Sequence, residues 1–126
     1  MYNGIGIFNY ENGSKKYDGE FKNGIFDGQG VEIFESGMKK YAGSFVQGIW
    51  NGEGIEFYNC DTELKLHEGS FENAKLHGDG IQYYQNTHKK YEGQWTTGLF
   101  HGKGVLNYQS GHKKFEGMFE NGKVNG

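Results

Sequence analysis

The sequence predicts an all-β protein, built as a single-layer, elongated and twisted antiparallel sheet of tandem β-hairpins. Three observations predict this fold: an aromatic motif recurs along the chain, its rings alternate with other residues, and Gly is frequent throughout. Alternation with a period of two places side chains on one face of a strand. Of the 126 residues, 23 are Gly, and each would destabilise a helix by about 1 kcal/mol relative to Ala. We therefore expect no helix.

The first strand of each hairpin is predicted by a motif of ring, any residue, Gly, any residue and ring. The motif occurs five times, as YDGEF from Tyr17, YAGSF from Tyr41, HEGSF from His67, YEGQW from Tyr91 and FEGMF from Phe115. Successive starts lie 24, 26, 24 and 24 residues apart. Self-similarity at such a fixed period indicates a repeat architecture.

The second strand of each hairpin is predicted by a Gly-x-Gly motif that precedes Val or Ile. The motif begins at five positions, Gly4, Gly28, Gly52, Gly78 and Gly102. Asn23-Gly24 lies between the two motifs, and Asn-Gly is a strong signal for a tight hairpin turn. Ala74 replaces the turn Gly in one repeat, so we expect that turn to differ. Each unit thus predicts a hairpin of about 14–18 residues and a polar connector.

The repeats divide the chain into one continuous array over residues 1–126. We place a half repeat at 1–16, full repeats at 17–40, 41–66, 67–90 and 91–114, and a half repeat at 115–126. One connector, through Cys60 and Asp61, is two residues longer than the others. This insertion, His67 and Ala74 mark the least regular part of the array.

The predicted core consists of aromatic rings, because aromatic residues make up 17% of the chain and aliphatic residues are few. A Gly inside a strand offers no side chain to pack. Between two rings, however, it leaves room for a ring from the next strand to lie over bare backbone. Such columns of rings give a single sheet a core without a second layer.

Composition and charge exclude several classes of protein. The formal net charge is −3 and no Arg is present, which does not indicate a nucleic-acid binder. The single Cys60 excludes an internal disulfide. The N-terminus has no signal-peptide pattern, and no apolar run approaches the roughly 20 residues of a membrane span. We expect a cytoplasmic protein.

Three patterns that can carry chemistry are better interpreted as structural. A phosphate loop needs a helix after its Gly-rich segment, and none is predicted here. His77 and His101 occupy equivalent positions in adjacent repeats, about 10 Å apart, which is too far to share one metal ion. Cys60 lacks an oriented base of the kind that activates a nucleophile. The sequence therefore predicts no enzyme, no cofactor and no metal site.

Paired lysines recur at one position of the repeat. They hold 8 of the 13 lysines, at Lys15, Lys16, Lys39, Lys40, Lys89, Lys90, Lys113 and Lys114. In a stacked array they predict a basic ridge. The ridge either contacts anionic lipid, at about 1 kcal/mol per Lys, or is a solvated sheet edge, since Lys discourages edge pairing.

Partner binding is predicted for a row of apolar residues near the hairpin tips. The row consists of Phe26, Trp50, Leu76 and Phe100. A single-layer sheet cannot bury every ring, and exposed apolar patches mark interaction surfaces. We expect a helical or extended protein segment to lie along this row.

The motifs together resemble the MORN repeat (membrane occupation and recognition nexus). The resemblance rests on the YEGxF/W segments, the Asn-Gly tips and the Gly-x-Gly segments, and it covers essentially the whole chain. Departures from the family pattern are Ala42, His67, Ala74 and the two-residue insertion. The resemblance implies a non-catalytic scaffold or adaptor in a cytoskeletal, axonemal (ciliary) or membrane-associated assembly. The alternative that it implies is an anionic-lipid-binding or accessory module of a larger enzyme, of the lipid kinase or lysine methyltransferase type.

The array begins and ends inside a motif, which predicts unpaired sheet edges. Terminal repeats normally need caps. We therefore expect that the chain continues in a longer protein, that a partner covers the edges, or that copies associate edge to edge.

Overall fold

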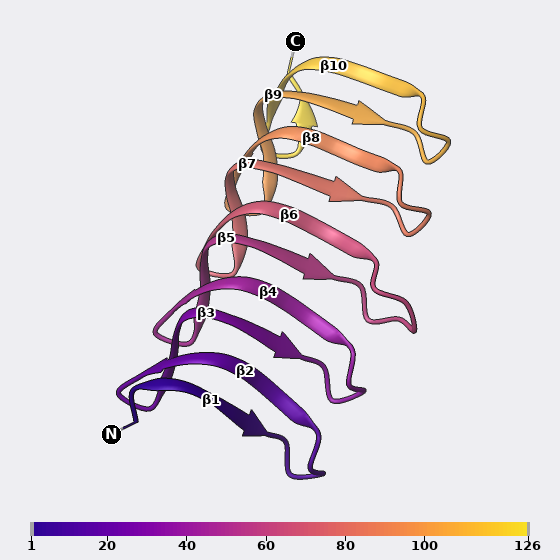
Figure 1. Cartoon of the computed structure of the whole chain (residues 1–126). Helices are drawn as coiled ribbons and strands as arrows, with labels where there is room; N and C mark the ends of the chain where they lie inside the picture. Colours follow the sequence, from indigo (N-terminus) through magenta and orange to yellow (C-terminus); the bar gives the residue numbers. More distant parts are fainter. Residues whose placement is uncertain (1, 126) are drawn as a thin grey trace.

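The computed structural model describes residues 2–125, which form one open antiparallel sheet of 11 strands (Figure 1). Strand order in the sheet follows strand order in the chain, and the described residues contain no helix. The all-β, single-layer prediction is therefore confirmed. The strands are β1 (Gly4–Asn9), β2 (Lys15–Lys22), β3 (Ile25–Ile33), β4 (Lys39–Val46), β5 (Ile49–Phe57), β6 (Lys65–Glu72), β7 (Lys75–Tyr83), β8 (Lys89–Thr96), β9 (Leu99–Asn107), β10 (Lys113–Glu120) and β11 (Lys123–Val124).

Two-residue turns join the strands of each hairpin. Asn23 and Gly24 have φ angles of 53° and 77°, as the primed turns that Asn-Gly favours require. Asn73 and Ala74 adopt the same conformation, with φ of 51° and 68°. The expectation that the Ala74 turn differs is therefore wrong. The Ala74 amide donates to the Trp50 carbonyl at 3.0 Å, and this bond to the preceding unit holds a backbone conformation that disfavours a Cβ by about 1–2 kcal/mol.

Each long strand bends sharply at its central Gly. Tyr41 and Phe45 are four residues apart in β4, where a flat strand would separate them by about 13 Å, yet their ring centroids lie 5.2 Å apart. The strand must therefore curve toward the rings, as Figure 1 shows for successive strands. We call the concave side that holds the rings the ring face, and the convex side the outer face.

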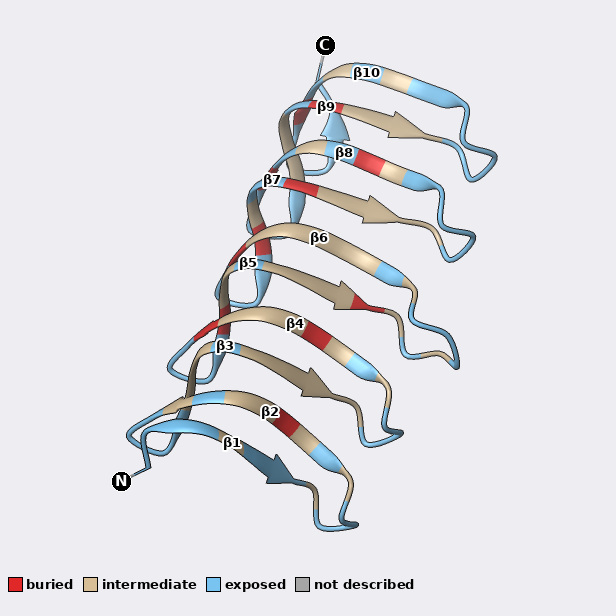
Figure 2. Cartoon of the chain, viewed as in Figure 1, coloured by how far each residue is buried: buried red, intermediate tan, exposed pale blue. Residues whose placement is uncertain are grey.

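Three columns of side chains fill the ring face. The second-column ring of Phe45 meets the first-column rings of Tyr17 and Tyr41 edge-on, at 5.1 and 5.2 Å. Trp50, in the third column, stacks flat on Tyr41 at 4.5 Å with an interplanar angle of 5°. Figure 2 shows buried residues recurring at the same level of β2, β4 and β8. The columns are Tyr17, Tyr41, His67, Tyr91 and Phe115; Phe21, Phe45, Phe71, Trp95 and Phe119; and Phe26, Trp50, Leu76 and Phe100.

Paired glycines make this packing possible. Gly43 of β4 pairs with Gly54 of β5, and a Cβ on Gly54 would overlap the Tyr41 hydroxyl. That hydroxyl donates to the Ser44 carbonyl at 3.0 Å. The prediction that a ring of the next strand covers the Gly between two rings is wrong at Gly43, and the ring of Tyr41 instead covers Gly54 of the partner strand. At Gly43 the space is filled differently, because a Cβ there would first meet the backbone of Glu53 and Gly54.

Replacing Gly54 by Ala tests how much the fold depends on this contact. The Tyr41 ring is held between neighbouring rings and cannot move aside, so we expect the free energy of unfolding to fall by about 1–3 kcal/mol, as for other overpacked cores. Urea unfolding followed by circular dichroism measures the change.

Gly6→Ala is the matched control for this substitution. Gly6 occupies the equivalent position in β1, but a Cβ there would meet Phe21 at 3.2 Å, and neither Gly has a left-handed φ. A loss at Gly54 no larger than that at Gly6 would contradict the proposed role of the ring contact.

Candidate functional site

The four residues predicted to bind a partner are mostly buried in the core. Trp50 and Leu76 are buried, with 9% and 2% of their surface exposed, and Phe26 and Phe100 are half-buried. Phe26 and Phe100 stack on Tyr17 and Tyr91 at 3.9 and 4.0 Å. The four residues lie within β3, β5, β7 and β9 rather than in loops. Their contact with a partner remains a prediction, and only their outer edges are available for it.

Exposed aliphatic side chains lie beside this row, around the hairpin turns. We call them the turn stripe: Ile25, Val46, Ile49 and Leu99, which are 43–48% exposed. Ile25, Ile49 and Leu99 begin β3, β5 and β9, so equivalent positions in adjacent hairpins are about 10 Å apart. Sequence reasoning missed the stripe, although each of these three residues directly follows the Gly of a turn. Lys75 holds the equivalent position in β7.

The paired lysines do not form a single ridge, because neighbouring residues of a strand point to opposite faces. The first Lys of a pair meets a carboxylate: Lys15 lies 3.2 Å from Asp18, and Lys89 lies 3.1 Å from Glu92. Lys39 and Lys113 likewise contact Glu63 and Glu116. The second Lys lies 5.5–5.9 Å from ring centroids, namely Lys16 over Phe8, Lys40 over Trp50, Lys90 over Tyr84 and Lys114 over Tyr108. Lipid contact by these residues remains a prediction.

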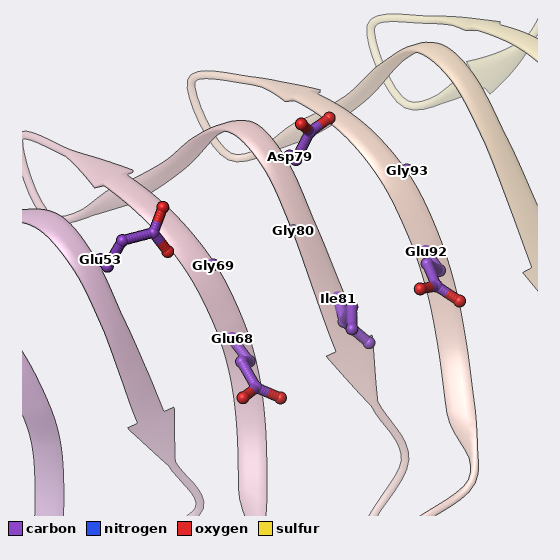
Figure 3. Close-up of a pocket in the computed structure, with 8 residues that line it drawn as sticks. All are labelled: Glu53, Glu68, Gly69, Asp79, Gly80, Ile81, Glu92 and Gly93. Carbon is purple, nitrogen blue, oxygen red and sulfur yellow. The ribbon is translucent and has the colours of Figure 1, made fainter.

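The outer face carries a shallow furrow over the bends of the strands. Figure 3 shows Glu53 and Asp79 on one side and Glu68 and Glu92 on the other, with glycine backbone between them. Its volume is about 410 Å³. Lys65 contacts Glu68 at 3.3 Å and Lys89 contacts Glu92, so one flank is largely neutralised. The furrow is therefore mixed in charge rather than strongly acidic.

The two histidines and the cysteine considered in the sequence analysis make hydrogen bonds to nearby backbone. His77 Nδ1 accepts a hydrogen bond from the Thr97 amide at 3.2 Å, and His101 Nδ1 accepts one from the Asn121 amide at 3.4 Å. Cys60 Sγ donates to the Thr62 carbonyl. Within residues 2–125, no three His, Cys, Asp or Glu side chains gather as metal ligands. The same residues include no helix long and apolar enough to cross a bilayer.

Burial of the first-column tyrosines raises their pKa. Tyr17 and Tyr41 have no exposed surface, and burial raises the pKa of each phenol to about 12. The neighbouring Glu20 carboxylate adds to the rise at Tyr17. Burial and a hydrogen bond to Glu68 likewise raise the pKa of Tyr83 to about 12.

Stability should therefore fall as the pH rises from about 10 to about 12. In this window the unfolded chain loses the phenolic protons while folded Tyr17, Tyr41 and Tyr83 keep theirs. Below pH 10 both states hold these protons and the contribution to stability is complete. Absorbance at 295 nm should show these three tyrosines titrating later than Tyr in the urea-unfolded chain. Coincident titration of the folded and unfolded chains would contradict the packing of these rings.

Comparison with known proteins agrees with this geometry. The family model of the MORN repeat matches four segments, residues 17–39, 41–59, 67–88 and 91–113. No curated protein matches the chain at a significant level. The four matched segments span more than half of the chain and coincide with successive hairpins of the sheet. The chain therefore belongs to the MORN repeat family.

Proposed function

We propose that this chain is a non-catalytic scaffold that binds a segment of a partner protein along the turn stripe. The observation that carries the proposal is the exposure of Ile25, Ile49 and Leu99 at equivalent positions of the array. Exposed apolar side chains that gather on one surface mark interaction sites. MORN repeats are consistent with such a repeat-based binding role.

The spacing of the stripe favours an elongated partner segment. Contacts that recur about every 10 Å match side chains three residues apart in a polyproline II segment, about 9 Å, or two turns apart in an α-helix, about 11 Å. Hydrogen bonds between successive units, such as Gly48 amide to Phe26 carbonyl at 2.7 Å, keep the spacing fixed.

The setting that we propose is a cytoskeletal, axonemal or membrane-associated assembly in the cytoplasm. This part of the proposal rests on the kind of assembly in which the family serves. The alternative is a lipid-binding module, or an accessory module beside the catalytic domain of a lipid kinase or lysine methyltransferase. The carboxylates and rings that contact the paired lysines favour the scaffold.

Site-specific photo-crosslinking tests the scaffold. A benzophenone amino acid at Ile49 should crosslink one partner in cells that make the protein, and the purified partner should bind the unmodified chain. Ile49→Ser should weaken that binding at least tenfold, because the lost contact is apolar. The control places the same crosslinker at Glu53, which is exposed on the outer face of the same strand. Equal crosslinking from both positions, or binding unchanged by Ile49→Ser, would refute the stripe as the site.

Vesicle flotation tests the lipid alternative. We expect the chain to bind phosphatidylserine vesicles no more strongly than neutral phosphatidylcholine vesicles, because the paired lysines already have partners within the chain. The matched variant replaces Lys16, Lys40, Lys90 and Lys114 by Gln, which removes the four lysines that lie over rings. A preference for anionic vesicles that this variant loses would support the lipid module instead.

A further inference from the structure

One repeat lacks the flat ring stack that its neighbours contain. Tyr41 stacks on Trp50 at 4.5 Å, and Tyr91 stacks on Phe100 at 4.0 Å. The repeat between them has His67 and Leu76 at these two positions. His67 and Leu76 are smaller than the aromatic side chains at these positions in the flanking repeats, so side chains fill less of the ring face there.

A hollow of about 350 Å³ lies where this ring stack is missing. A dry cavity of roughly 150 Å³ accepts benzene, so the hollow has room for an aromatic ring. Leu76 and Trp95 are themselves buried within its lining. Its remaining wall comes from two hairpin turns and from Phe71, His67 and Glu56.

Trp95 adapts to the missing tyrosine without completing the packing. In the flanking repeats a tyrosine hydroxyl lies over the second-strand Gly, as Tyr41 does over Gly54. Over Gly80 that place is taken by Leu76 and by the Trp95 indole nitrogen. This N–H is buried and has no hydrogen-bond partner, whereas the Trp50 indole N–H donates to Glu32 at 2.9 Å.

The rim of the hollow carries a hydrogen-bond acceptor that a ligand can reach. His67 Nδ1 lies 2.8 Å from one oxygen of Glu56, and the two side chains are 24% and 25% exposed. The carboxylate therefore has capacity to accept a further hydrogen bond from a phenol O–H or an indole N–H. Leu99 lines the hollow and also belongs to the turn stripe, so the two surfaces are continuous.

We propose that this hollow receives one tyrosine or tryptophan side chain of the partner segment, which restores the missing ring and donates to Glu56. Three observations support this occupant: rings fill the equivalent place in both flanking repeats, the acceptor complements a donor on the ligand, and the hollow opens onto the stripe. The proposal rests on the scaffold function and assigns it an anchor position.

Side-chain analogues test the proposal without a known partner. The probes are p-cresol and 3-methylindole, titrated against the folded chain, with the two tryptophan indole N–H signals followed by NMR. We expect saturable shifts of the Trp95 signal and little change at Trp50. Toluene, which lacks the donor, should bind at least threefold more weakly than p-cresol.

Leu76→Phe is the decisive variant, because it puts a ring of the chain's own into the hollow. It should weaken p-cresol binding at least tenfold and leave the melting temperature unchanged or higher. The double variant His67→Tyr with Trp95→Phe restores the first and second columns of the regular repeat, while Leu76 stays in the third. Because this variant lacks the Trp95 signal, binding to it is followed by the broadening of the p-cresol signals themselves, and the same loss is expected. Phe100→Leu is the converse control and should allow p-cresol to bind in the next repeat.

Several outcomes would overturn the proposal. They are equal shifts of both indole signals, no saturable shift at Trp95, or full binding to a folded Leu76→Phe or His67→Tyr/Trp95→Phe variant. These failures are distinct from failure of the scaffold itself. A partner that still crosslinks at Ile49 while p-cresol does not bind would leave the scaffold in place and remove the anchor. Binding of p-cresol at Trp95 without any crosslinked partner at Ile49 would leave the hollow as a ring-binding site and refute the scaffold function on which the proposal rests.

Discussion

The contact between a tyrosine ring and a pair of glycines determines the rest of the structure. Tyr41 can lie against the sheet only because Gly43 and Gly54 present bare backbone beneath it. Lying there, it makes the strand bend and offers a flat surface on which Trp50 stacks. The bend in turn brings second-column rings between successive first-column rings. A single sheet thereby acquires an interior, which otherwise requires a second layer of strands or helices.

The sequence predicts the architecture well because the repeat presents each structural signal several times. Side chains with period two and recurring Gly agree in every unit, Asn-Gly turns add to them in two units, and the 11-stranded sheet follows these signals. The placement of Trp50 was harder to predict. In the β4–β5 pair, Ser44 alone lies opposite residues 51–53, because Gly43 pairs with Gly54 and Phe45 with Trp50. This irregular pairing keeps Trp50 within β5, at a position that a strict alternation of ring and non-ring residues would place in the loop.

Other differences arise from contacts between repeats, which a single motif does not encode. The Ala74 turn keeps the ordinary conformation because the preceding unit binds its amide. The paired lysines separate because adjacent strand positions face opposite ways. In three of the four pairs the first Lys contacts a carboxylate three residues on, and Lys39 contacts Glu63 instead. The hollow beside His67 appears only when the columns are assembled, since it reflects two substitutions nine residues apart that meet across one hairpin.

The location of the two-residue insertion leaves the spacing between hairpins unchanged. The extra residues lie in the connector near Cys60, outside β5 and β6, whose pairing places Gly54 opposite Gly69 as in the regular units. Backbone hydrogen bonding sets the distance between strands at about 4.8 Å whatever the length of the connector. The axial interval between successive hairpins therefore stays constant along the array, even where connectors differ in sequence and length.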